Sequence, residues 1–209
     1  PFSEGSWTVM ARTNTYVREM AKWFYKTGFK FSIKGRSSIS EKLIENIMAW
    51  DELCQDKKLG VERIKKLYSG LPKQGDDAVV KRGATKRLDT LEPEDELDMA
   101  ALMSDYGLLR GADHAAYDVL KVAHSMRLYI EAIQRRGDNL LSPPRINIST
   151  FHAMKGGEDD NCVVYTASTK ACVESKHPDD EHRAFYVGVT RARHSLYILQ
   201  SNNNYRYTI

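Results

Sequence analysis

The sequence has few cysteines and no long apolar run, and both absences narrow the classes of protein it can belong to. Cys54, Cys162 and Cys172 are the only cysteines in 209 residues, and they lack the spacing of a disulfide framework. This pattern predicts reduced thiols and a cytoplasmic protein. No apolar run approaches the roughly 20 residues that a membrane-spanning helix needs, and no signal-peptide pattern opens the chain. The chain begins with Pro1 instead of methionine, which indicates a piece of a longer protein.

The overall composition fits a globular protein with a substantial core. Hydrophobic residues make up 42% of the chain and charged residues 28%, while the net charge is only +3. This weakly basic balance permits a nucleic-acid partner without requiring one, because a local patch matters more than the total charge. The length suits one large domain or one domain with a sizeable insertion.

Short β-prone segments alternate with helical segments at both ends of the chain. In the helix expected at 15–28, Val17, Met20 and Phe24 share one apolar face, and Gly28 is placed to end the helix. Strands separated by helices favour a parallel sheet with right-handed crossovers. The strands are expected at 7–11, 29–34, 145–150, 162–167 and 195–200, with a last helix at 179–193.

The middle of the chain has a different character. Residues 40–140 are dominated by helical periodicity, whereas 1–39 and 141–209 carry the β/α pattern. We therefore expect an α/β domain built from the two outer segments and interrupted by a helical insertion. A stretch near 71–94, rich in glycine, proline and charge, predicts a flexible loop within that insertion.

One segment, "INISTFHAMKGGEDDNCVVY", combines a strand end with polar groups and glycines. The strand ends at Thr150, and ligands of open α/β sheets bind at strand ends. Gly156 and Gly157 would let the backbone approach a phosphate or a sugar closely, and Glu158 can accept hydrogen bonds from ribose hydroxyls. The alternative is an ordinary turn with a charged face.

Three segments resemble superfamily 1 DNA helicases of the Rep and UvrD type. "ISTFHAMKGGE" resembles their motif V, and "DDEHRAFYVGVTRAR" resembles their motif VI. Near the start, "VMARTNTYVREMAKWFYKTGFKFSIKG" is similar to the strand–helix–strand that opens their second motor domain. The matches occur in the family's order and cover roughly the outer half of the chain. Gly157 and Asp159 depart from the leucine and aromatic residue usual around the motif V glutamate, so a looser turn is expected there.

The resemblance implies a RecA-like fold and a role as the second motor domain of an ATP-dependent DNA helicase acting in DNA repair or replication. The partners implied are single-stranded DNA, duplex junctions and an N-terminal RecA-like domain that binds ATP with Mg²⁺. No stretch of this chain fits the phosphate-loop pattern Gly-x-x-x-x-Gly-Lys-Ser/Thr. The chain is therefore expected not to hydrolyse ATP alone.

For the nucleotide, the resemblance implies that Arg191 is the arginine finger and that Gly156 and Glu158 contact ATP. Arg183 matches the first arginine of motif VI and is expected to support motif V or the interface with the partner domain. Arg193 has no family role, and we interpret it as a surface cation at a helix C-terminus or a backbone-phosphate contact. The alternative for Arg191 is the same capping role, since cations are favoured at helix C-termini.

For DNA, the resemblance points to strand ends and turns where side chains can reach phosphates and sugars without reading sequence. His152 has an alternative interpretation as a buried structural histidine. Tyr207 is expected to stack on a base, although a frayed, solvated C-terminal tail is the other possibility. The residues implied are Arg12, Asn14, Thr150, His152 and Tyr207.

Two other classes of function compete with the helicase interpretation. A RecA-like module without catalysis would bind nucleic acid or protein only, and it would have no reason to keep Arg191 and Glu158. A helicase–nuclease would need a cluster of nuclease carboxylates, which this sequence does not show. No metal site is expected, because Cys172, His177 and His182 lack the tight spacing of a structural zinc site.

Overall fold

The computed structural model describes residue 2, residues 4–175 and residues 178–208 of the chain. The chain divides into two compact units, residues 1–38 with 131–209 (unit 1) and residues 39–130 (unit 2). The helices and strands of unit 1 are β1 (Trp7–Ala11), α1 (Asn14–Thr27), β2 (Phe31–Ile33), β3 (Arg36–Ser37), β6 (Ile146–Thr150), the 3₁₀ turn η1 (His152–Met154), β7 (Asp159–Tyr165), α8 (Lys170–Val173), α9 (Pro178–Val189) and β8 (Ala192–Leu199).

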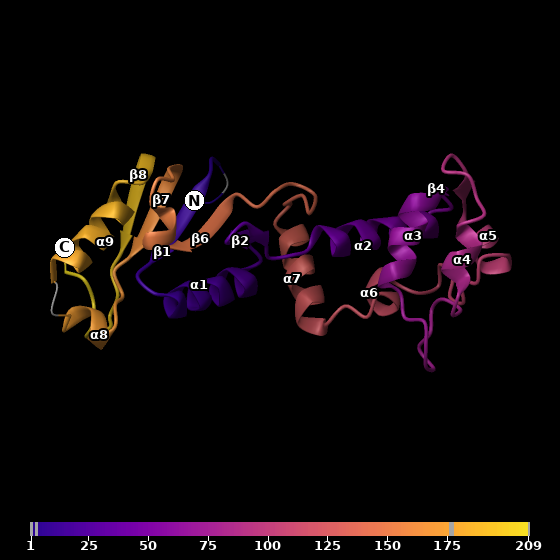
Figure 1. The fold of residues 1–209 in the computed structure, drawn as a ribbon, viewed down its shortest axis with the longest axis horizontal. Helices are drawn as coiled ribbons and strands as arrows, with labels where there is room; N and C mark the ends of the chain where they lie inside the picture. The colour runs from indigo at the N-terminus through magenta and orange to yellow at the C-terminus, as the bar shows by residue number, and fades with distance from the viewer. Residues whose placement is uncertain (1, 3, 176–177, 209) are drawn as a thin grey trace. The chain divides into compact units, whose positions relative to one another are not determined.

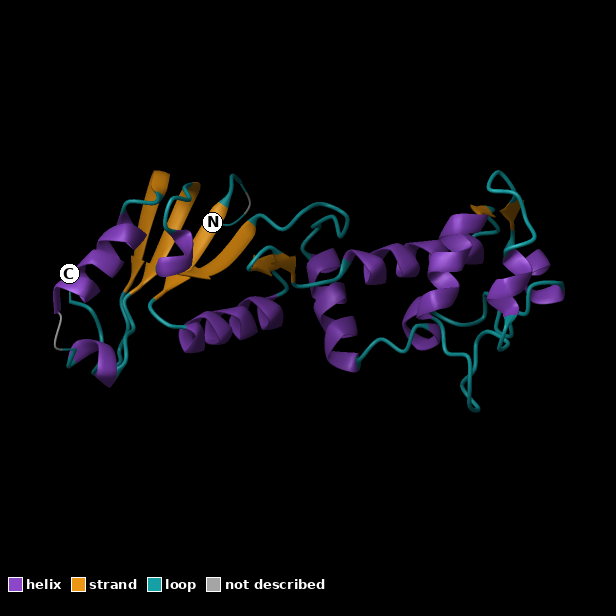
Figure 2. Cartoon of the chain, viewed as in Figure 1, coloured by secondary structure: helices purple, strands orange, loops and turns teal. Residues whose placement is uncertain are grey.

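Unit 1 is built on a six-stranded sheet in the order β3-β2-β6-β1-β7-β8 (Figures 1 and 2). All neighbouring strands are parallel except β2 and β3, which pair as an antiparallel hairpin. The first and last segments of the sequence share this sheet, because β1 lies between β6 and β7. The expected fold class, a RecA-like parallel sheet with flanking helices, is confirmed.

Helices α1 and α9 cover opposite faces of this sheet. Met10 and Val164 share a buried cluster with Phe185 of α9, whereas Val9, the neighbour of Met10 along β1, lines a cavity together with Phe24 of α1. Successive side chains of a strand point to opposite faces, so the two helices lie on different sides. Right-handed crossovers running in opposite directions along the sheet require the same arrangement.

Local sequence signals explain where several elements begin and end. Gly28 ends α1 in the left-handed conformation, with φ of 72°, which favours glycine. Helix α9 ends at Val189, earlier than the 179–193 expected, and the hydroxyl of Thr190 donates to the carbonyl of Tyr186 in its last turn at 2.9 Å. Arg191 therefore lies in the short turn between α9 and β8.

Unit 2 is mainly helical and has its own core. The indole Nε1 of the buried Trp50 donates to the carbonyl of His114 at 2.8 Å, so the polar atom of this large side chain is satisfied. Its elements, with α7 running past its C-terminal boundary, are α2 (Glu41–Cys54), β4 (Leu59–Gly60), α3 (Val61–Gly70), α4 (Ala84–Leu88), β5 (Glu96–Leu97), α5 (Met99–Ser104), α6 (Ala116–Val119) and α7 (His124–Arg135).

Two details of the middle segment differ from the sequence-based expectation. The stretch near 71–94, expected as a flexible loop, contains α4 and a β-bridge from Val80 to Leu108, because the apolar Val80 and Leu88 are fully buried. Residues 131–140 group with unit 1 and not with the insertion. In that stretch the guanidinium of Arg136 lies 3.6 Å from the ring centroid of Phe29, a cation–π contact.

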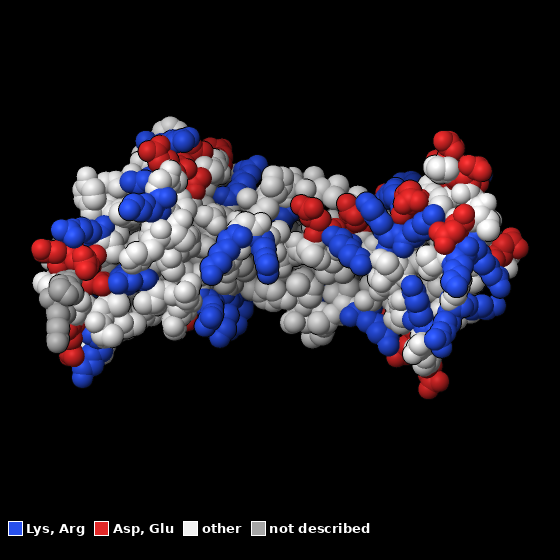
Figure 3. Space-filling model, viewed as in Figure 1, with Lys and Arg blue, Asp and Glu red and all other residues white. Residues whose placement is uncertain are grey.

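The edge strand β8 is exposed along most of its length. Leu196, Tyr197, Ile198 and Leu199 are each 40–52% exposed, although their apolar character is typical of a covered strand. Acidic and basic side chains are interspersed on the visible surface of each unit (Figure 3), in keeping with the small net charge. Within the described ranges, no helix is both long and apolar enough to cross a bilayer.

Candidate functional site

The residues singled out from the sequence form two groups at opposite ends of the parallel strands. Thr150 pairs with Ala11 where β6 and β1 both end. Asp159 pairs with Ala192 where β7 and β8 both begin. We call these the carboxyl-end group and the amino-end group. Glu158 follows the strand end at Thr150 in the sequence, yet it lies in the amino-end group, because residues 151–158 return along the sheet before β7 starts.

Arg191 is the centre of the amino-end group. Its guanidinium donates from Nη1 to the carbonyl of Gly157 at 3.1 Å and from Nε to the carbonyl of Val187 at 2.9 Å. Its own carbonyl accepts from the backbone N–H of Asp159 at 3.1 Å. Arg191 is thus bonded, from side chain and backbone, to the turn that carries Glu158.

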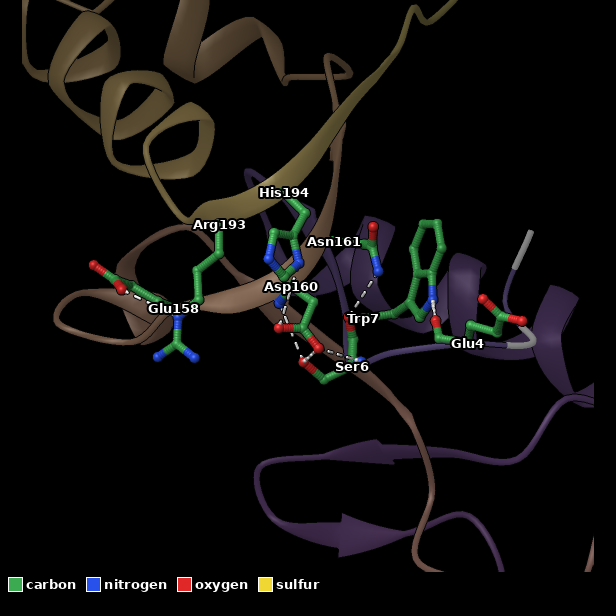
Figure 4. A network of polar contacts seen from close by, with 8 residues as sticks. All are labelled: Glu4, Ser6, Trp7, Glu158, Asp160, Asn161, Arg193 and His194. Atoms are coloured by element: carbon green, nitrogen blue, oxygen red, sulfur yellow. Dashed lines mark hydrogen bonds and ion pairs between the residues drawn. The ribbon is translucent and has the colours of Figure 1, made fainter.

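Glu158 lies just before β7, and its carboxylate pairs with Arg193 on β8. Arg193 Nε donates to Glu158 Oε2 at 3.3 Å, and both side chains are more than half exposed. Figure 4 shows the pair at the amino ends of the two strands. The interpretation of Arg193 as a cation at a helix C-terminus is wrong, because α9 has already ended at Val189.

The two carboxylates that follow Glu158 have structural partners. Asp159 accepts a short hydrogen bond from the hydroxyl of the buried Thr8. Asp160 accepts from the backbone N–H of Ser6 at 3.0 Å and from its hydroxyl at 3.1 Å (Figure 4). The backbone hydrogen bond from Ser6 is the largest cause holding the pKa of Asp160 below its ordinary value. Both residues therefore fasten β1 to β7.

The two glycines of the turn have separate physical roles. Gly156 has φ of 84°, a conformation that favours glycine, and a Cβ there would meet nothing within 4 Å, so a ligand can approach its backbone. A Cβ at Gly157 would lie 3.0 Å from Cε of Met154, which is itself packed in the core cluster. Gly157 thus lets the turn lie close against Met154 of the core cluster.

In the carboxyl-end group, three of the expected residues lie at the end of a strand or within three residues of one. His152 and Asn14 are exposed, and Thr150 is half-buried, with its hydroxyl accepting from the N–H of Ala153 at 3.3 Å. The interpretation of His152 as a buried structural histidine is therefore wrong. All three residues lie at the carboxyl end of the parallel strands.

Arg12, at the same end of the strands, is engaged by a partner that the sequence did not suggest. Its guanidinium makes two hydrogen bonds to the carboxylate of Glu181, at 2.5 and 2.7 Å, and the two side chains are only 19% and 14% exposed. A paired, largely buried arginine positions α9 against β1 in addition to any contact with DNA.

Tyr207 is held in place and is not part of a frayed tail. One face of its ring stacks on Phe185, with ring centroids 4.0 Å apart and planes at 15°. Its hydroxyl lies 2.7 Å from Nδ1 of His182, and its N–H donates to the carbonyl of Thr166 at 2.9 Å. Only the other face of the ring is left for a ligand.

The remaining candidates have simpler surroundings. Arg183 is 78% exposed and pairs with Asp180 on its own helix at 3.3 Å, rather than with the turn at 156–158. His177 lies outside the described residues. In the part of the chain that the structure describes, no group of three or more His, Cys, Asp or Glu residues is arranged to hold a metal ion.

Sequence reasoning missed two pairs because their members are far apart in the chain. Glu181 lies 169 residues from Arg12, and Glu158 lies 35 residues from Arg193. The second pair had a usable signal. The strands expected at 162–167 and 195–200 are separated by a single helix and were expected to be parallel, which would place the residues just before their starts side by side.

Comparison with known families agrees with this geometry. Residues 118–203 match the family model of the UvrD-like helicase C-terminal domain, which includes both motifs and strands β6 to β8. No curated protein matches the chain. Residues 118–203 are therefore similar to the C-terminal domain of UvrD-like helicases, and the mostly parallel sheet agrees with that similarity.

Proposed function

We propose that the chain is the second motor domain of a cytoplasmic ATP-dependent DNA helicase or translocase. In this role it supplies the arginine finger and part of a single-stranded DNA path. The observation that carries the proposal is the amino-end group, where hydrogen bonds join Arg191 to the turn that carries Glu158. A partner domain with a phosphate loop would complete the ATP site and hold Mg²⁺.

The amino-end group has the chemistry that a nucleotide requires. A guanidinium carries five N–H donors, and Arg191 spends three on the carbonyls of Gly157 and Val187 and the hydroxyl of Thr190, which leaves two. When ATP is bound, it supplies the phosphoryl group whose spreading negative charge a guanidinium stabilises. Glu158 offers an exposed carboxylate to ribose hydroxyls, and the open space beside Gly156 admits a ligand.

The carboxyl-end group supports the DNA role. Asn14, Thr150 and His152 present amide, hydroxyl and imidazole groups at one sheet edge, where backbone contacts need no sequence readout. Arg12 would add charge near that edge while paired with Glu181. Arg183 is exposed on α9, and in this proposal it supports the interface with the partner domain.

A second function remains in competition because Arg191 also caps a helix. Its bond to the carbonyl of Val187 satisfies a group at the C-terminus of α9, as a structural cation would. In a RecA-like module that only binds nucleic acid or protein, Arg191 would have that capping role alone. Measurements of ATP turnover separate the two functions.

The isolated chain should show no ATPase activity, with or without single-stranded DNA, because no phosphate loop is present in its sequence. Phosphate release by purified chain, at micromolar protein and millimolar Mg-ATP, is the measurement. Adding the separately purified phosphate-loop domain should restore turnover. Turnover by the chain alone that disappears with Arg191→Ala would contradict the proposed half-motor.

Tyr207→Ala should weaken single-strand binding by the full-length protein by about 1–3 kcal/mol if a base stacks on the free ring face. The loss should be similar for different DNA sequences, because stacking needs no hydrogen-bond readout. Fluorescence anisotropy of a labelled oligonucleotide measures it. His182→Ala is the matched control, because it removes the partner of the Tyr207 hydroxyl and keeps the ring. Unchanged binding by Tyr207→Ala would assign Tyr207 to packing on Phe185 only.

A further inference from the structure

Arg193 lies in a position that no motif explains. It is the second residue of β8, and its Nε reaches Oε2 of Glu158, which directly precedes β7. Strands β7 and β8 are parallel neighbours that begin at the same end of the sheet, with Asp159 opposite Ala192. The ion pair is therefore a consequence of strand register and not of chance contact between surface side chains.

Glu158 differs from the two acidic residues that follow it because one of its carboxylate oxygens has no hydrogen bond within the described part of the chain. Asp159 is bonded to the buried Thr8, and Asp160 is bonded twice to Ser6 and lies 3.8 Å from the imidazole of His194 (Figure 4). Among the residues that the structure describes, Glu158 has one hydrogen-bond partner, through a bond from Arg193 Nε to its Oε2. A carboxylate has about four acceptor positions, so Oε1 keeps its full capacity.

We propose that Arg193 is a positioning residue that holds Glu158 by Oε2 and turns Oε1 toward the ribose of a bound nucleotide. The chain then favours ribonucleotides over nucleotides that lack the ribose hydroxyls. This inference rests on the proposed function, because it assumes that Glu158 contacts the sugar. The effect is modest, since the two side chains are 59% and 55% exposed.

Equilibrium binding of ADP and of 2′,3′-dideoxy-ADP to the full-length protein tests this role without relying on turnover. Isothermal titration calorimetry gives both dissociation constants for the native protein, Arg193→Ala, Arg193→Lys and Glu158→Ala. Arg63→Ala is the matched control, because it removes an exposed arginine from another Arg–Glu pair, that with Glu52. We expect Arg193→Ala to weaken ADP binding about two- to fivefold and to leave dideoxy-ADP binding unchanged.

The variants separate failure of this inference from failure of the proposed function. Glu158→Ala should abolish the preference for ADP, and Arg193→Lys should keep part of it, because a lysine retains the charge without the fork. An Arg193→Ala protein that keeps the full preference, or that loses affinity equally for both nucleotides, overturns the positioning role. A Glu158→Ala protein that still prefers ADP instead overturns the sugar contact itself.

Discussion

Arg191→Ala in the full-length protein should lower kcat for ATP hydrolysis by about 10³-fold or more, the range known for arginine fingers in GTPases. The dissociation constant for ATP should change far less, because a finger acts mainly on charge that develops in the transition state. Steady-state phosphate release gives kcat, and calorimetry with a non-hydrolysable ATP analogue gives the affinity.

Two further variants make the Arg191 result specific. Arg191→Lys should restore little of the lost kcat. The planar guanidinium of Arg191 binds the carbonyls of Gly157 and Val187 and still has donors for a phosphate, whereas the compact ammonium of lysine has no such fork. Arg36→Ala, which removes an exposed arginine on β3 of the same unit, should leave kcat unchanged. A folded Arg191→Ala protein with nearly normal kcat would mean that Arg191 only caps α9.

Phe151→Ala should destabilise unit 1 by about 3–5 kcal/mol, the cost of truncating a buried phenylalanine to alanine. Phe151 is fully buried, and its ring lies 4.7 Å from that of Phe185. A Cβ built on Gly188 would lie 2.9 Å from Cδ1 of Phe151, so the backbone of α9 already rests on the ring. Collapse of α9 into the cavity would also strain the ion pair between Glu181 and Arg12.

Native-state hydrogen exchange of the β7 amides measures this loss in unit 1 separately from unit 2. Phe151→Leu should lose less stability, because most of the volume is kept. Leu141→Ala is the matched control, since Leu141 is apolar but 57% exposed. A loss below about 1 kcal/mol for Phe151→Ala would show that the core around α9 repacks freely.

Local patterns were sufficient to predict most elements of unit 1. The strand at 7–11 follows from its short β-prone run, and the end of α1 follows from the left-handed Gly28. The end of α9 could not be predicted from local patterns, because apolar periodicity continues past Val189. The hydrogen bond from the Thr190 hydroxyl to a carbonyl of the last turn is visible only in the structure.

The candidate site was predictable only where one short segment carries it. Thr150 and Glu158 stand in the same motif, so the motif located both. What surrounds them depends on residues brought together by the sheet: Arg193 beside Glu158, and Glu181 beside Arg12. For Tyr207, the sequence showed an aromatic ring but not that Phe185 occupies one of its faces.

The separation of the two groups has a mechanical consequence. Strand β7 has seven residues and spans roughly 20 Å, at about 3.3 Å per residue. Inside unit 1 the two groups are joined by hydrogen-bonded parallel strands, β6, β1 and β7, and a paired sheet resists stretching. The sheet therefore keeps the two groups at a fixed separation. A movement of the strand ends near Arg191 moves the strand ends near Thr150 with them, as one rigid body.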